Sequence, residues 1–348
     1  AIDQINSGVP YPIKGAWIQT ANILGGQAAR ANFHYEALKK LEFVAVVDLF
    51  HNPTTMALAD IVLPAATFAE KDSFRSWWAP LGVMHKTIQV GECKSDWEIN
   101  FELARRLSPR KLKYNNVKEL FNERLEVANT NFDELVEQGS FKMPEDGPYK
   151  PYRRHERGLL RRDGKPGFET ASGKIELYSS VYKSWGLDPL PYYDEPPQSP
   201  VRTPELFEKY PLIMITGARS HVYFHSEHRM IPWLREKNPQ PYVEVHPETA
   251  KKYGVYDGEW VFLENDLGKV QRKVRISLRV HPKMIHTLHS WWMPEMKGKE
   301  PDLFGVWDYQ INQLVPGPQH SDSGFGGGQY KTTLAKISSI NGQEGNHG

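Results

Sequence analysis

Cysteine is nearly absent from this sequence: Cys93 is the only one in 348 residues. One thiol cannot form a disulfide within the chain, and it cannot hold an iron–sulfur cluster, which needs about four thiolates. Long apolar runs are also missing, since none approaches the roughly 20 residues that cross a bilayer. The sequence therefore predicts no internal disulfide, no iron–sulfur cluster and no membrane span in this chain.

An excess of charge of one sign is missing too, because 43 basic residues stand against 42 acidic ones and the net charge is +1. No overall field favours nucleic acid, so any anion site must be local. The N-terminus has neither a signal-peptide pattern nor an initiator methionine. We therefore expect that it is not the natural start and that targeting information lies upstream.

Residues 1–110 predict a partial α/β domain. Apolar runs at 16–20, 43–47 and 60–64 alternate with helical patterns at 35–41 and 53–59. Such alternation predicts a parallel sheet with ligands at the carboxyl ends of its strands. No G-x-G-x-x-G follows the first strand, which disfavours a nicotinamide- or flavin-dependent enzyme and leaves it as a rival.

The remainder of the chain predicts a connecting region and a β domain. Residues 111–207 combine helical patterns with basic and proline-rich stretches, which favour an irregular lid or interdomain wrap. Residues 208–340 contain many short strand patterns with turn signals, as in a closed barrel, and 341–348 form a tail. The predicted fold is thus α/β followed by mostly β.

A candidate anion site follows the apolar run at 211–215. Thr216, Gly217 and Arg219 offer a hydroxyl, a backbone position without Cβ and a forked cation within four residues. A phosphate-bearing ligand could sit close to such a main chain. The alternative is an ordinary strand-end turn with a surface arginine.

Four phrases along the chain resemble the C-terminal half of the molybdopterin oxidoreductases. They are Asp48-x-Phe50 with 59–64 (ADIVLP) and 70–72 (EKD); 170–178 (TASGKIELY); 246–261 (HPExAxxxGxxxGxxV); and Asn312-Gln-Leu314 with Asp322-x-Gly324 and Lys331. They occur in the family's order and span nearly the whole chain. Within the family they are most similar to the thiosulfate/polysulfide reductase and acetylene hydratase branches.

The resemblance implies a parallel-sheet dinucleotide-binding domain plus a double-psi β-barrel. It implies two molybdopterin guanine dinucleotides per molybdenum or tungsten, with oxygen-atom or sulfur transfer at the metal. The family's other half carries a 4Fe-4S cluster and the metal's protein ligand, so no catalytic or metal-ligating residue is expected here and the isolated chain should be inactive. Expected partners are that N-terminal half and an iron–sulfur electron-transfer subunit, in the periplasm or cytoplasm of a prokaryote, with no nucleic acid.

The resemblance also assigns residues to the cofactor. Thr216, Gly217 and Arg219 would hold a pyrophosphate or pterin edge, His225 and Ser226 would line the cofactor, and Asp48 would bind guanosine. Asn22 is a weaker assignment, because Gly25-Gly26 departs from the family's GxNP phrase. The late loop that would wrap the dinucleotides contributes Asn312, Gln319, Asp322 and Lys331.

Several of these residues have other interpretations. Asp48 could cap a loop, and His225 could simply be packed or, with His221 and His228, suggest a zinc site that no fourth ligand completes. The pairs Trp77-Trp78 and Trp291-Trp292 could border a substrate funnel, although buried packing is the commoner role of tryptophan. Residues 324–328 (GFGGG) are not a Walker loop, because no Gly-Lys-Ser/Thr follows. A non-catalytic scaffold that binds a nucleotide or partner through the barrel is a further alternative.

Overall fold

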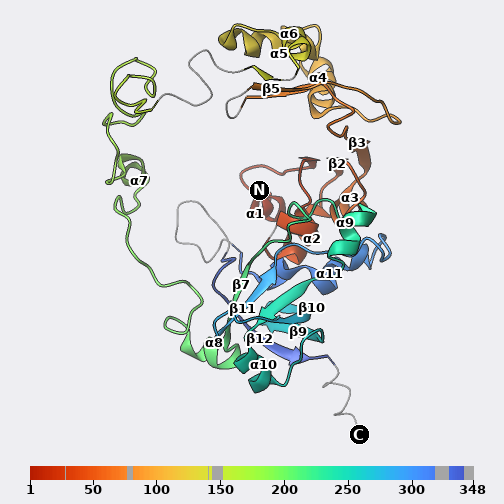
Figure 1. Cartoon of the computed structure of the whole chain (residues 1–348), viewed down its shortest axis with the longest axis vertical. Helices are drawn as coiled ribbons and strands as arrows, with labels where there is room; N and C mark the ends of the chain where they lie inside the picture. The colour runs from red at the N-terminus through yellow and green to blue at the C-terminus, as the bar shows by residue number, and fades with distance from the viewer. Residues whose placement is uncertain (28, 77–80, 140, 143–151, 318–328, 341–348) are drawn as a thin grey trace. The chain divides into compact units, whose positions relative to one another are not determined.

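The structure is a computed structural model that describes residues 1–27, 29–76, 81–139, 141–142, 152–317 and 329–340 (Figure 1). The chain divides into two compact units. The first joins Ala1–Val62 to Tyr193–Gly348, and the second is Leu63–Tyr192. Each unit has hydrophobic clusters of its own.

The first unit contains both a parallel sheet and a barrel. Its elements are α1 (Ile2–Ser7), β1 (Gly15–Gln19), η1 (Ile23–Gln27), α2 (Ala31–Leu38), β2 (Phe43–Asp48), α3 (Pro53–Leu58), β3 (Ile61–Pro64), α8 (Pro204–Lys209), β7 (Leu212–Ala218), α9 (Pro232–Lys237), β8 (Tyr242–Val245), α10 (Pro247–Tyr253), β9 (Trp260–Asn265), β10 (Gly268–Ile276), β11 (Met284–Leu288), η4 (Leu303–Gly305), α11 (Val306–Tyr309), η5 (Ile311–Leu314) and β12 (Thr333–Ser339).

The sheet has the strand order β1-β2-β3, and β1 pairs with β2 in parallel from Gly15↔Phe43 to Gln19↔Val47. The four residues 44–47 of β2 are all buried, as an apolar run covered on both faces requires. α3 begins where Asn52 accepts hydrogen bonds from Thr54 N and Thr55 N. The predicted α/β arrangement of this segment is confirmed.

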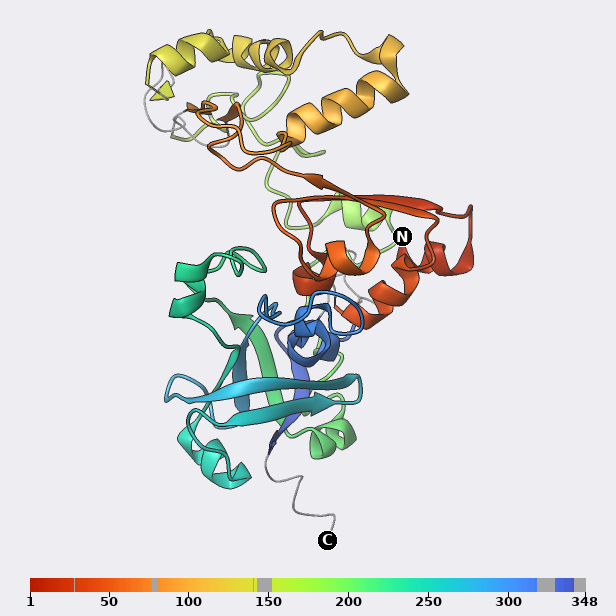
Figure 2. The same ribbon diagram turned by 90° about the vertical axis from the view of Figure 1, so that its right-hand side faces the viewer.

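The barrel closes in the order β10-β8-β11-β7-β12-β9. It mixes parallel pairs (β10 with β8, β11 with β7) with antiparallel ones (β10 with β9, β12 with β7). Helices α8 and α10 lie at the end of the barrel opposite the α/β layer (Figures 1 and 2). The predicted combination of α/β and barrel is confirmed.

Side chains alternate along β10, and Val270 and Val274 on its inward face are buried. Arg272 lies on the same face and is also fully buried. α10 begins at Pro247 and ends before Gly254, whose φ of 63° is the left-handed conformation that favours glycine. A proline at the start and a glycine after the end are typical of such a helix.

The second unit packs helices on a small antiparallel sheet. Its elements are β4 (Ser73–Arg75), β5 (Leu81–Met84), α4 (Asp96–Leu107), η2 (Pro109–Lys111), α5 (Val117–Leu125), η3 (Glu126–Ala128), α6 (Phe132–Glu137), β6 (Phe141–Lys142) and α7 (Ser180–Ser184). A capping box begins α4, because Ser95 Oγ accepts from Glu98 N and the Glu98 carboxylate accepts from Ser95 N. Phe121 is the centre of the core, with its ring 5.3–5.6 Å from those of Phe74, Trp97 and Phe132.

This division differs from the boundaries predicted at residues 110 and 207. Residues 63–110 all fall in the second unit, in which β4 and β5 pair with β6 through β5 and not with the parallel sheet. Residues 193–207 belong to the unit of the barrel. Among the described residues, no helix is both long and apolar enough to cross a membrane.

Candidate functional site

Three separate segments of the first unit converge on the main chain of Gly26 in η1. The Gly26 carbonyl accepts hydrogen bonds from Ser290 Oγ and from Asn312 Nδ2, each at 3.1 Å. A Cβ on Gly26 would lie 2.9 Å from Ser226 Cβ, so only glycine allows this approach. The turn at 226, the end of β11 and η5 therefore meet the α/β layer at one point.

Asn22 organises the start of η1. Its Oδ1 accepts from Gly25 N at 2.9 Å and from Thr54 Oγ1 at 2.8 Å. A Cβ on Gly25 would lie 2.3 Å from Asn22 Nδ2, which explains why glycine stands there. The structure thus gives Asn22 a local role, and its contact with a cofactor stays a prediction.

In the strand-end motif, Thr216 is buried and hydrogen-bonded, whereas Arg219 is exposed. Thr216 is buried, and its hydroxyl and its N–H both contact Tyr330 O, at 2.9 and 3.0 Å. Gly217 is exposed, and the nearest heavy atom to an added Cβ is 3.8 Å away. Arg219 is exposed and makes no hydrogen bond or ion pair to any residue that the structure describes. Of the three, Arg219 is therefore the side chain available to an anion.

The two residues of the 225–226 turn differ in exposure. His225 is exposed, and its Nδ1 lies 3.1 Å from His289 Nε2. Ser226 is 8% exposed and borders Gly26. The turn therefore has a ring nitrogen of His225 on its open side and a small side chain against the α/β layer.

Asp48 lies at the end of β2 and holds the following loop. Its carboxylate accepts from Leu49 N and Asn52 Nδ2, both at 2.7 Å. This is the loop-capping arrangement given above as the alternative interpretation. Binding of guanosine by Asp48 stays a prediction.

Asn312 is 2% exposed, and its buried Oδ1 has no hydrogen-bond partner among the residues that the structure describes. A buried amide oxygen without a donor costs about 1–3 kcal/mol, so such an atom indicates a missing partner. Lys331 is exposed, and the structure gives its side chain no partner among the described residues. Gln319, Asp322 and residues 324–328 lie outside the described residues, as do Trp77 and Trp78.

Trp291 and Trp292 are buried, with 0% and 3% of their surface exposed, so the packing interpretation holds for this pair. Trp292 Nε1 donates to Ser226 O at 3.3 Å and so stabilises the turn at 225–226. In the part of the chain that the structure describes, no three His, Cys, Asp or Glu side chains are grouped to hold a metal ion. His221 and His228 bring no further ligand to His225.

Sequence reasoning did not single out three residues of this site: Arg229, His289 and Ser290. Arg229 is 2% exposed and donates to His225 O and Ser290 O, at 2.8 and 2.9 Å. Its pKa falls to about 9, chiefly because burial removes it from water. Ser290 follows Arg229 by 61 positions, and nothing in the local sequence signals that contact.

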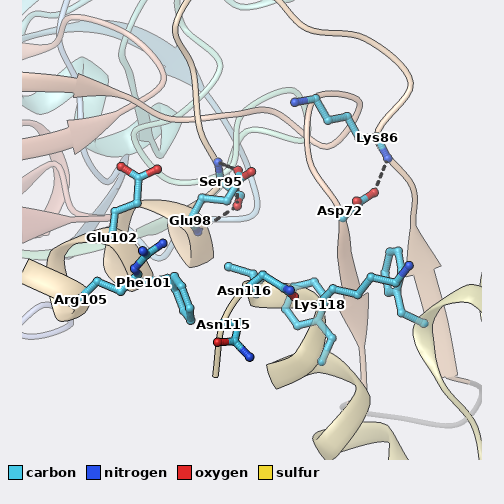
Figure 3. Close-up of a pocket in the computed structure, with 13 residues that line it drawn as sticks. Asp72, Lys86, Ser95, Glu98, Phe101, Glu102, Arg105, Asn115, Asn116 and Lys118 are labelled. Carbon is cyan, nitrogen blue, oxygen red and sulfur yellow. Dashed lines mark hydrogen bonds between the residues drawn. The ribbon is translucent and has the colours of Figure 1, made fainter. Parts of the chain in front are cut away.

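The second unit has a cavity of about 400 Å³ between α4, α5 and the β4–β5 region (Figure 3). Its polar lining serves the fold. Asp72 accepts from Lys86 N at 2.8 Å, Ser95 and Glu98 cap α4, and Lys118 pairs with Asp133 outside the cavity. Phe101, Phe121 and Phe132 supply its apolar wall.

Comparison with known proteins decides the family. The family model described as Molybdopterin oxidoreductase matches residues 6–106, and the one described as Molydopterin dinucleotide binding domain matches residues 212–334. A dopamine dehydroxylase from Eggerthella lenta is 31% identical across 90% of this chain, and an acetylene hydratase from Syntrophotalea acetylenica is 32% identical across 83%. This chain belongs to the molybdopterin oxidoreductase family. The resemblance predicted from its four phrases is confirmed.

The solved acetylene hydratase from Pelobacter acetylenicus has the same fold as this molybdopterin oxidoreductase chain. The TM-score is 0.85 at 27% identity, across 97% of this chain and 46% of that one. The chain spans 37% of the dopamine dehydroxylase and 38% of the Syntrophotalea acetylene hydratase. It thus covers well under half the length of these relatives.

Asn312 and Arg219 offer groups that fit a molybdopterin dinucleotide. Asn312 Oδ1 is a buried acceptor without a donor in the described part of the chain, and a pterin edge carries N–H groups. Arg219 follows β7 inside the segment that the dinucleotide-binding model matches, and it pairs with none of the described residues. The donor and acceptor chemistry therefore matches the family's cofactor.

Proposed function

We propose that this chain is the C-terminal, cofactor-binding part of a molybdenum or tungsten oxidoreductase with two molybdopterin guanine dinucleotides. One observation carries the proposal: among the residues that the structure describes, the buried Asn312 Oδ1 has no partner, and it lies where three segments meet Gly26. Gly26 falls within residues 6–106, and the three segments that meet it fall within residues 212–334, the two stretches that the family models match.

Each residue would have a limited task. Asn312 Oδ1 would accept from a pterin N–H, Arg219 would pair with a phosphate, and His225 would donate to or accept from a ring nitrogen of the pterin. Thr216 and Asp48 would act mainly by holding the neighbouring loops, since their polar groups already have partners. Once bound, the metal supplies two-electron chemistry with oxygen-atom or sulfur transfer.

The rest of the enzyme would come from outside this chain. A 4Fe-4S cluster needs about four thiolates and the chain has one cysteine, so the cluster would belong to an N-terminal half. The same half would supply the metal's protein ligand, and an iron–sulfur subunit would deliver electrons. The isolated chain would then be inactive.

The first experiment measures molybdenum, tungsten and iron per mole of polypeptide in protein purified from its native source. About one molybdenum or tungsten with several irons supports the proposal. None of the three metals contradicts it and favours a non-catalytic scaffold that binds a nucleotide or a partner. Turnover by the isolated chain with an artificial electron donor would contradict the claim that it is inactive alone.

A further inference from the structure

Arg229 joins two segments that are far apart in the sequence. Its Nη1 donates to His225 O at 2.8 Å, and its Nη2 donates to Ser290 O at 2.9 Å. The guanidinium carbon lies 4.6 Å from the ring centre of Trp291 and 4.9 Å from that of Tyr223. Among the described residues no acidic side chain pairs with it, and its Nε has no partner. Arg229 is thus a buried fork aimed at two carbonyl oxygens, with no ion pair.

Both carbonyls belong to strained residues. His225 has a φ of 52° and Ser290 a φ of 50°, the left-handed region that residues other than glycine rarely adopt. Such conformations cost about 1–3 kcal/mol each and persist where the surroundings enforce them. The guanidinium of Arg229, which hydrogen-bonds to both residues, can stabilise these two conformations.

A histidine pair lies beside the residues that Arg229 contacts. His289 precedes Ser290, and its Nε2 lies 3.1 Å from His225 Nδ1. On its other side, His289 Nδ1 lies 3.1 Å from Ala218 O. Arg229 therefore contacts one histidine of the pair directly, His225, and it contacts Ser290, the residue after the other histidine.

Only one assignment of donor and acceptor fits the hydrogen bond between the two histidine rings. A carbonyl oxygen only accepts, so His289 Nδ1 must carry the hydrogen that contacts Ala218 O. In a neutral ring the other nitrogen is then an acceptor, so His225 Nδ1 donates to His289 Nε2. Burial lowers the pKa of His289 more than its hydrogen bond to Ala218 O raises it, which keeps this ring neutral at neutral pH. His225 Nε2 is left with no partner in the described part of the chain.

We propose that Arg229 is a positioning residue, whose fork holds the strained turns at His225 and Ser290 so that His225 Nε2 faces the cofactor. Because Nδ1 carries the hydrogen, that nitrogen accepts a hydrogen bond from a heterocyclic N–H. The identity of the ligand, a pterin, rests on the proposed function. The alignment of the His225 and His289 rings does not depend on the proposed function.

The test is ¹⁵N NMR of the histidine rings in the full chain without cofactor. We expect His289 to carry its proton on Nδ1 and His225 to carry its proton on Nδ1. In Arg229→Gln the side-chain amide reaches only one carbonyl, and in Arg229→Lys the charge remains without the fork. Both variants should lose the single-tautomer pattern, and the pterin retained by the assembled enzyme should fall about tenfold, the equivalent of one lost hydrogen bond.

Arg272→Gln is the matched control. Arg272 is equally buried and donates to Tyr309 O at 2.7 Å, but it holds neither strained turn. This variant should keep the wild-type tautomers even though it destabilises the barrel. A structural effect of losing any buried arginine would instead change the pattern in all three variants.

Several results would overturn the proposal. One is a His289 ring protonated at Nε2 in the wild type, and another is an unchanged pattern in both Arg229 variants. If Arg229→Gln does not fold, Arg229→Lys decides the test, because it keeps the charge and loses only the fork. An unchanged pattern in that variant then overturns the proposal. A wild-type chain that has the expected tautomers but binds no pterin would instead contradict the proposed function.

Discussion

Arg219 and Thr216 stand three residues apart at the end of β7, and they differ in whether their side chains have partners within the protein. The Thr216 hydroxyl is committed to Tyr330 O, whereas Arg219 is exposed and the structure shows no contact of its side chain within the described ranges. An exposed arginine can form charge-assisted, bidentate hydrogen bonds with a phosphate, so Arg219 is the residue of this motif to test for anion binding.

Arg219→Ala should therefore leave folding intact and weaken cofactor retention. The unfolding free energy should change by less than about 0.5 kcal/mol, as for most surface substitutions. Retained dinucleotide should fall roughly tenfold to a hundredfold, since a charge-assisted hydrogen bond contributes about 1.5–3 kcal/mol. Chemical denaturation and the pterin released per mole of protein measure the two effects.

Arg279→Ala is the control for this prediction. Arg279 is exposed and precedes β11, at the end of that strand opposite Leu288. Its removal should change neither quantity. Equal retention in the Arg219 and Arg279 variants would remove Arg219 from the site.

Gly26 provides a second test at the scale of one residue. An added Cβ would lie 2.9 Å from Ser226 Cβ and 3.1 Å from Ser290 Oγ, so Gly26→Ala must push two turns away from η1. We expect a loss of about 1–3 kcal/mol in unfolding free energy, typical of overpacking. Gly217→Ala, with nothing closer than 3.8 Å, is the stability control and should change it little. Similar losses in both variants would contradict the tight junction.

The sequence predicted part of this site. His225, Ser226 and Asn312 were identified by resemblance, and the structure places Ser226 and Asn312 against Gly26. Arg229 was not identified, because an arginine in a polar stretch looks like a surface cation. Its fate depends on the carbonyl of Ser290, and backbone carbonyls carry no sequence signal.

At the scale of elements, β10 combines a regular alternation with one buried charge. Arg272 lies between Val270 and Val274 on the inward face, and its guanidinium donates to Thr287 Oγ1 at 2.9 Å and to Tyr309 O at 2.7 Å. Burial lowers its pKa to about 9, so it stays protonated at neutral pH. The arginine thus ties β10 to β11 and to α11.

Arg272→Gln should cost about 2–4 kcal/mol of unfolding free energy, because it leaves the Tyr309 carbonyl unsatisfied and opens space in the barrel. Arg275→Gln is the matched variant, since Arg275 lies on the same strand but is exposed, 3.7 Å from the ring centre of Tyr242. It should cost no more than about 1 kcal/mol. Equal midpoints and slopes in urea for the two variants would contradict the bonding role of Arg272.

Elements marked by a continuous apolar run or a helical period were predictable. The runs at 43–47 and 60–64 match β2 and β3 to within one residue, and the helical pattern at 53–59 matches α3 equally well. β4, β5 and β6 were not predicted, because they have two to four residues and show neither a period nor a continuous apolar run. Their antiparallel pairing forms a sheet separate from the parallel one, which no local pattern reveals.

At the scale of the whole chain, two units have separate cores. The core of the barrel includes Met214, Val243 and Leu263, whereas that of Leu63–Tyr192 is built around Phe121 and Phe132. A chain with separate cores can unfold in more than one step, so a single unfolding midpoint need not describe it.

Phe121→Ala should therefore destabilise the second unit selectively. Phe121 is 1% exposed, and its loss should cost about 3–5 kcal/mol, as for other buried aromatic residues. Hydrogen exchange should accelerate in α4, α5 and α6 and stay unchanged in β7–β12. Leu107→Ala, at an exposed position that ends α4, is the control and should change neither region. Faster exchange in the barrel of the Phe121 variant would show that the two cores are coupled, and the candidate site would then depend on both units.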